Sequence, residues 1–249
     1  MLLVSCSIFA QVKHDYNWAL GHDSNLVDST FGGTDINFNT NPISLSYVFR
    51  DMNIEQTNAT MSDAEGNLIF YSNGCKIFNA DHELMENGDN INPGEVHDIQ
   101  CEDAYTVLQG MIALPAPGND SLYYLFHQHL IYIPSPFDIQ IDQLLCTKID
   151  MTLNNGKGAV TLKNEPVINN ILEYGQLTAV KHANGEDWWV LAPGDTSNLY
   201  YSIQVASDTI TQPTVQEIGL PFNYYGGGSG QACFSPDGTK YARYNKIDQ

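Results

Sequence analysis

A short turn motif recurs along the chain, and it limits the possible folds more than any other feature of the sequence. Its clearest copy is FSPDGTKYA at residues 234–242, where Pro-Asp-Gly separates hydrophobic residues from an alternating polar and aromatic run. This pattern is typical of a β-hairpin. Similar turns precede aromatic-rich runs at residues 63–71, 117–126 and 184–191. The chain is therefore predicted to consist of repeated β-hairpins.

The spacing of these turns indicates how the hairpins are organised. Their glycines, Gly66, Gly118, Gly185 and Gly238, are 52, 67 and 53 residues apart. Blades of a β-propeller recur at roughly 40–50 residues, so the spacing predicts an all-β propeller of four-stranded antiparallel blades with insertions. About four units fit the chain. Because the last strand pair has no room for its partners, we expect an incomplete propeller.

The charge balance excludes some classes of partner. The 249 residues carry 29 Asp and Glu against 10 Lys and Arg, a formal net charge of −19, with 43% hydrophobic residues. The hydrophobic content is enough to build a core. The negative electrostatic field of the protein repels phosphate backbones and anionic lipids. Nucleic acid and acidic membranes are therefore not expected as partners. Excess surface carboxylate is typical of a soluble exported protein.

The first ten residues resemble the end of a secretory signal. They are uncharged and mostly apolar, and the chain turns polar at residue 11, but no basic segment precedes them. We therefore interpret residues 1–10 as a truncated signal-peptide remnant and residues 11–249 as one partial propeller domain. Alternatively, LVSC at residues 3–6 is a lipoprotein motif with Cys6 as the lipidated residue. No later stretch has the ~20 apolar residues of a membrane-spanning helix.

The remaining cysteines leave the disulfide pattern open. No pair is spaced as C-x-x-C, so neither zinc nor redox chemistry is indicated. In an oxidising compartment the four could pair in three ways, or several could be buried thiols. The cysteines concerned are Cys75, Cys101, Cys146 and Cys233.

Two segments resemble metal sites without matching one. Residues 81–103 are acidic, but their spacing does not fit an EF-hand loop, so a solvated connection is predicted. His127 and His129 are two apart on a predicted strand and share a face, yet no spacing marks a third ligand. We interpret them as strand histidines satisfied by neighbouring groups. No metal or cofactor is predicted.

Longer runs resemble a known family. SDAEGNLIFYSNG at residues 62–74, IDMTLNNGKG at 149–158 and LTAVKHANG at 177–185 are similar to the N-terminal propeller of large exported bacterial proteins that use type IX secretion. Residues 234–242 alone resemble the WD-repeat-like and TolB-like propeller blade. The resemblance implies a seven-bladed or similar propeller, secreted or on the outer cell surface, followed by further domains. It provides no catalytic residues to transfer.

The function favoured by these observations is binding or adhesion without catalysis, with a surface glycan or a protein as ligand. A propeller offers a rigid rim of loops on which such function resides. A structural spacer or assembly platform is the alternative. A glycan-active hydrolase is disfavoured because no sialidase Asp-box, Gly-x-Ser-x-Gly elbow or His-Glu-x-x-His helix is present. The candidate ligand-binding aromatics, which could instead pack between blades, are Trp188, Trp189, Tyr224 and Tyr225.

Overall fold

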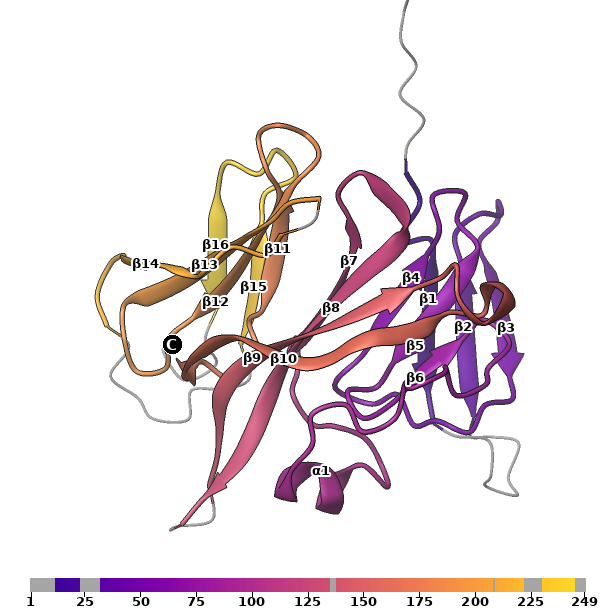
Figure 1. Cartoon of the computed structure of the whole chain (residues 1–249), viewed down its shortest axis with the longest axis horizontal. Helices are drawn as coiled ribbons and strands as arrows, with labels where there is room; N and C mark the ends of the chain where they lie inside the picture. The colour runs from indigo at the N-terminus through magenta and orange to yellow at the C-terminus, as the bar shows by residue number, and fades with distance from the viewer. Residues whose placement is uncertain (1–11, 23–31, 135–137, 208, 222–229, 245–249) are drawn as a thin grey trace, which may run out of the picture.

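The protein is all-β, as the turn motifs predict. The computed structural model describes residues 12–22, 32–134, 138–207, 209–221 and 230–244. Within them the strands form five antiparallel sheets that follow one another in chain order. In Figure 1 the first two sheets lie at the right, the third in the middle and the last two at the left. The predicted signal remnant, Cys6, Tyr224 and Tyr225 lie outside the described residues.

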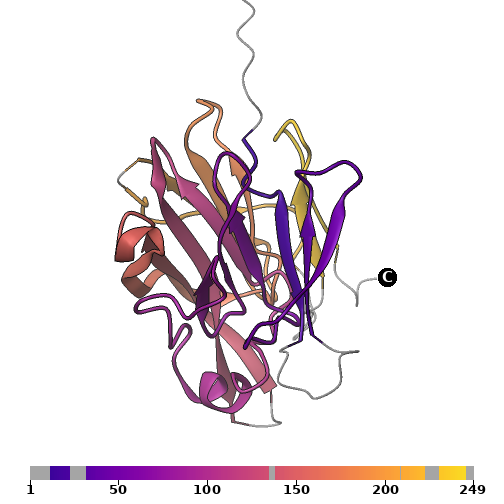
Figure 2. The ribbon, with the colours of Figure 1, turned by 90° about the vertical axis from the view of Figure 1, so that its right-hand side faces the viewer.

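The first two sheets have three strands each, in the orders β1-β2-β3 and β4-β5-β6. Figure 2 views the molecule from the side of the first sheet. The bounds of these strands are β1 (Asn17–Gly21), β2 (Gly33–Asn37), β3 (Ser44–Val48), β4 (Ala59–Ser62), β5 (Leu68–Ser72) and β6 (Ile77–Asn79).

The third and fourth sheets have four strands each and the last has two, so the predicted four-stranded unit is present in two of the five sheets. Within the described residues the longest strands are β8, β9 and β10 of the third sheet, with 15, 13 and 14 residues, whereas β7 has 6. The bounds are β7 (Met111–Ala116), β8 (Asn119–Ile133), β9 (Asp138–Asp150), β10 (Ala159–Leu172), β11 (Thr178–Lys181), β12 (Trp188–Pro193), β13 (Leu199–Val205), β14 (Thr214–Glu217), β15 (Gln231–Phe234) and β16 (Tyr241–Tyr244).

The four marker glycines occupy equivalent places. Gly66, Gly118, Gly185 and Gly238 each lie between the first and second strands of a sheet, at φ values of 93°, 72°, 80° and 69°. Residues other than glycine rarely adopt this left-handed region, which explains the recurring glycine. The predicted hairpins are therefore confirmed. The described residues form five sheets against the roughly four units predicted, and the first sheet, β1-β2-β3, was not among the units counted.

The acidic connection at residues 81–103 is not simply a solvated loop. It contains the short helix α1 (Glu95–Gln100), which no periodicity predicted. Upstream of this helix the connection covers the outer edge of the second sheet, where the Ile77 amide donates to the Gly88 carbonyl at 2.7 Å. Carboxylates that look free in the sequence also have partners, since the Lys157 ammonium lies 2.9 Å from Asp81 and 2.7 Å from Glu83.

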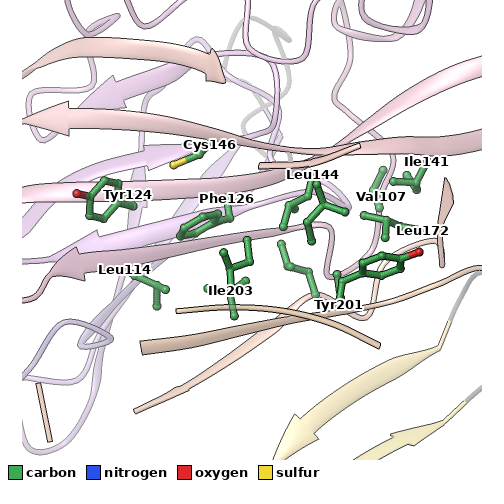
Figure 3. Close-up of a cluster of buried hydrophobic side chains, with 14 of the residues drawn as sticks. Val107, Leu114, Tyr124, Phe126, Ile141, Leu144, Cys146, Leu172, Tyr201 and Ile203 are labelled. Atoms are coloured by element: carbon green, nitrogen blue, oxygen red, sulfur yellow. The ribbon is translucent and has the colours of Figure 1, made fainter. Parts of the chain in front are cut away.

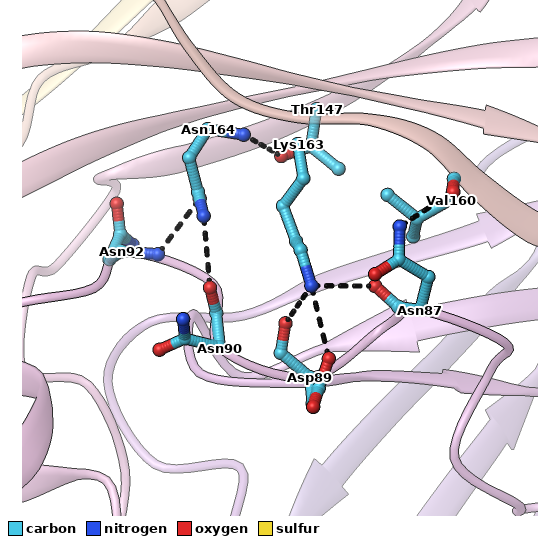
Figure 4. A network of polar contacts seen from close by, with 8 residues as sticks. All are labelled: Asn87, Asp89, Asn90, Asn92, Thr147, Val160, Lys163 and Asn164. Atoms are coloured by element: carbon cyan, nitrogen blue, oxygen red, sulfur yellow. Dashed lines mark hydrogen bonds and ion pairs between the residues drawn. The ribbon is translucent and has the colours of Figure 1, made fainter.

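A polar network fixes the same connection to the third sheet (Figure 4). The Lys163 ammonium donates to the Asn87 carbonyl and to both the carbonyl and the carboxylate of Asp89, all within 3.1 Å. Hydrogen bonding to Lys163 holds the pKa of Asp89 below its ordinary value. Asn164 donates to the Asn90 carbonyl at 2.9 Å. The Asp89 carboxylate and the backbone carbonyls of residues 87, 89 and 90 thus dock the connection onto β10.

One disulfide forms among the four cysteines. Cys75 and Cys101 are bonded, with their Cα atoms 5.7 Å apart, and join the β5–β6 turn to the end of α1. A crosslink that closes a span of 26 residues restricts the unfolded chain and stabilises the fold by about 3 kcal/mol. Cys146 is a buried thiol and Cys233 an exposed one. None of the three possible two-bridge pairings of these four cysteines is therefore present.

Apolar side chains fill the spaces between successive sheets. The largest cluster joins the third and fourth sheets, where Phe126 and Leu144 pack with Ile203 and Tyr201 (Figure 3). A second cluster joins the second and third sheets, and a smaller one around Ala19 joins the first and second. The first four sheets thus pack face against face in chain order through these three clusters.

Hydrogen bonds from polar side chains also connect successive sheets. Their partners are backbone groups in the loops that precede the first strand of a sheet. Buried Thr57, before β4, uses one hydroxyl to donate to the Val107 carbonyl and to accept from the Val107 amide, both at 2.8 Å. Buried Gln128 of β8 donates to the Glu173 and Gly175 carbonyls at 3.0 Å. Its Oε1 accepts from the Gly175 amide at 2.8 Å.

Gln109, before β7, reaches further along the chain. Its side-chain amide pairs with both backbone groups of Ala232 in β15, at 2.6 and 2.8 Å, across 123 positions of sequence. Its own carbonyl accepts from the Leu177 amide at 3.1 Å. Buried backbone groups must be hydrogen-bonded. Thr57 and Gln128 satisfy such groups in loops, and Gln109 satisfies those of Ala232 in β15.

We expect Gln128→Glu to destabilise the fold by about 3 kcal/mol or more, because it would place a buried carboxylate against two carbonyl oxygens. Urea unfolding measures the change. The matched control is Gln216→Glu on the exposed strand β14, which should stay within about 0.5 kcal/mol of the wild type. Equal effects of the two variants would contradict the assigned role of Gln128.

Candidate functional site

The first strands of successive sheets come together. β1 contacts β4, β4 contacts β7, and β11 contacts β15. β1, β4, β7 and β11 border a cleft of about 710 Å³ that receives side chains from the first four sheets. This volume lies within the range of small-ligand sites. The residues lining the cleft are Val12, His14, Asp15, Trp18, Ala19, Leu20, Asn58, Thr60, Met61, Ala113, Leu114, Pro115, Lys181 and Trp188.

Trp18 supplies an accessible aromatic surface to the cleft. It lies in β1 and is 50% exposed, which is unusual for so large an apolar side chain. Phe38 packs edge-on against its indole, with ring centroids 5.0 Å apart. The side chain is therefore supported on one side while half of its surface stays open to solvent or ligand.

Trp188 lines the cleft from the fourth sheet. Its indole N–H donates to the Pro115 carbonyl at 3.1 Å, which fixes the ring against the third sheet. The Lys181 ammonium lies 3.8 Å from the ring centroid, a close cation–π contact. Desolvation lowers the pKa of Lys181, an effect that Asp187 and Glu186 oppose. Trp188 is thus both packed between sheets and part of the cleft wall.

The polar groups of the cleft are few and mixed in sign. The His14 Nδ1 donates to the Ser62 carbonyl at 2.7 Å, and its Nε2 has no hydrogen-bond partner among the described residues. Asp15 and Asn58 are exposed. Asp15 is the one carboxylate among the described lining residues, whereas glycosidic hydrolysis generally requires a pair.

The other predicted aromatics lie elsewhere. Trp189, next in sequence to Trp188, points to the opposite face of β12 and lines a separate groove of about 600 Å³ beside the last sheet. Sequence reasoning selected Trp188 and overlooked Trp18, because a single tryptophan in a Gly- and Asp-rich segment resembles loop sequence. The one sequence feature that could have indicated Trp18 is its place in β1 between Asn17 and Ala19, which are both buried.

His127 and His129 are both hydrogen-bonded by neighbouring groups, in agreement with their interpretation as satisfied strand histidines. Buried His127 contacts the Asn92 side chain through Nδ1 at 2.6 Å and the Thr147 hydroxyl through Nε2 at 2.9 Å. Desolvation lowers its pKa to about 3, so the ring is neutral at physiological pH. In the described residues no three His, Cys, Asp or Glu side chains are grouped to hold a metal.

His129, in contrast to the neutral His127, is in a site that favours the charged imidazolium. Its Nδ1 lies 2.6 Å from the Asp142 carboxylate and its Nε2 2.8 Å from the Pro93 carbonyl. Both partners are acceptors, so both ring nitrogens must carry a proton. The hydrogen bond to Asp142 accordingly raises the pKa of His129.

The raised pKa predicts a pH-dependent contribution to stability. It is complete below about pH 6.5, the ordinary histidine value, and is lost as the pH rises through the higher folded-state pKa. We expect His129→Gln to destabilise the protein by about 2 kcal/mol at pH 6 and less at pH 9. Urea unfolding at both pH values measures this difference. The control is His22→Gln, at a ring 48% exposed, and an equal loss at both pH values would refute the charged state.

No protein-family model, curated protein or solved structure matches the chain. None of the helices in the described residues has the length and apolar character needed to cross a membrane.

Proposed function

We propose that this chain is a non-catalytic binding module, a β-propeller of a larger exported protein that recognises a surface glycan in the cleft between its first strands. The observation that carries the proposal is the pair of indoles, Trp18 and Trp188, that two different sheets supply to one cleft. Aromatic faces with a few polar groups suit sugar rings, which have apolar C–H faces and a hydroxyl rim. Asp15, Asn58 and His14 are the polar groups available to those hydroxyls.

The propeller assignment rests on three features together. Successive antiparallel sheets follow chain order, the first strands of three pairs of successive sheets contact one another, and the marker turns fall in the same hairpin of four sheets. These features are typical of blades around a common axis. The Cys75–Cys101 disulfide supports export, because disulfides persist in oxidising compartments. The resemblance to type IX secreted proteins supports the same location.

An assembly platform is the second candidate function. The observation that favours it is the exposed apolar face of the first sheet, where Leu45 is 70% and Tyr47 58% exposed. Exposed apolar surface of this kind marks interaction sites on soluble proteins. The two functions are compatible, because the cleft borders β1 whereas the outer edge of this sheet is β3, on the other side of β2.

A glycan array probed with the purified chain tests the proposed function. We expect saturable binding that Trp18→Ala weakens about tenfold or more, or ~1.4 kcal/mol, because the exposed indole is the contact surface. Trp189→Ala is the matched control and should bind within about twofold of the wild type. A parallel peptide array distinguishes a protein ligand.

Equal binding by the two tryptophan variants would place the ligand outside the cleft. A folded wild-type chain that binds nothing on either array would favour the assembly platform instead.

A further inference from the structure

The outer strand of the first sheet has features of a docking edge. β3 is last in the order β1-β2-β3, so its outer side has no neighbouring strand in the described part of the chain. Residues 43–49, ISLSYVF, carry no charge. Every second side chain is apolar and exposed: Ile43 is 53%, Leu45 70%, Tyr47 58% and Phe49 65% exposed.

The equivalent third strands elsewhere are covered. In the third and fourth sheets a fourth strand, β10 or β14, pairs with the third. In the second sheet the acidic connection takes this place along β6, where Met85 donates to the Ile77 carbonyl and Asn79 donates to the Glu83 carbonyl, both at 2.9 Å. The uncovered edge of β3 is therefore an exception among these four sheets.

The apolar side chains of β3 belong to a continuous surface. Leu45 is registered opposite Ile36 of β2, which is opposite Trp18 of β1. Directly opposed residues of an antiparallel pair share a face, so all three lie on one side of the sheet. On the other side, Ala19 packs in the core against the second sheet. The exposed face thus extends from the cleft to the edge of β3.

Edge strands of soluble proteins usually carry lysine, proline or inward charges that prevent pairing with other chains. Residues 43–49 contain none of these. Pairing of two copies through β3 would bring together chains of net charge −19 each, which repel one another. A segment with basic residues avoids this repulsion and is attracted instead.

We infer that β3 accepts an extended segment of a partner protein as a fourth, antiparallel strand, with apolar side chains at alternate positions and basic residues at its ends. Backbone hydrogen bonds along β3 would supply affinity, and contacts with Leu45 and Tyr47 would supply specificity, as in other strand-addition complexes. This inference goes beyond glycan binding and does not depend on it.

The probe is the fluorescent peptide KKTVTVTVTKK, measured by anisotropy with the wild-type chain. The matched control peptide has the same sequence and charge but is N-methylated at alternate residues, which prevents strand pairing. We expect the N-methylated peptide and the double variant Leu45→Thr, Tyr47→Thr each to bind at least about tenfold more weakly. Val215→Thr, on the exposed edge strand β14, should bind like the wild type.

Hydrogen exchange locates the interaction. We expect the peptide to slow exchange of backbone amides in residues 44–47 and to leave β14 unchanged. Equal binding of the two peptides would overturn the inference, because charge alone would then explain it. Absence of binding up to about 1 mM peptide, or dimerisation with protection of β3 in the absence of peptide, would also overturn it.

Discussion

The arrangement of the sheets depends on a few polar side chains that pair with the backbone of distant loops. Thr57 and Gln128 each satisfy both an amide and a carbonyl of a loop that leads into a later sheet, and Gln109 does the same for Ala232 in β15. Apolar burial holds the sheets together, but it is non-directional and does not fix their relative position. Hydrogen bonds to buried backbone are directional, and an unmade one is costly, so they select a single arrangement.

This arrangement also produces the cleft. The paired loops lead into β4, β7 and β11, and Ala232 lies in β15, so these hydrogen bonds set where those first strands lie. Trp18 and Trp188, which are 170 residues apart in the sequence, line the same space as a result. The recognition surface is therefore a consequence of loop pairing. The outer edge of β3 lies at the opposite side of the first sheet from β1.

The strands were predictable where local turn chemistry marks them. Gly66, Gly118, Gly185 and Gly238 were sufficient to locate four hairpins, because a left-handed turn residue is a local requirement. The first sheet was not counted as a unit because the sequence of residues 22–32, which joins β1 to β2, contains no Asn-Gly, Asp-Gly, Glu-Gly or Pro-Gly pair. The propeller arrangement itself is still a proposal.

The non-local features could not be read in the same way. Helix α1 is only six residues long, too short for a periodic pattern. Gln109 and Gln128 look like any other polar residue in the sequence, because their hydrogen-bond partners are distant along the chain. Of the candidate site, the sequence indicated Trp188 but not Trp18 or the cleft, because a cleft built from four sheets exists only in the tertiary fold.

Native-state hydrogen exchange tests the role of the paired loops most directly. The amides of Val107, Gly175 and Leu177 lie outside strands. The first two donate to the side chains of Thr57 and Gln128, and the third donates to the backbone carbonyl of Gln109. If these pairs hold the sheets in place, the three amides exchange only through global unfolding, as slowly as the core of β8. Exchange as fast as that of the hairpin-turn amide Gly185 would contradict this account.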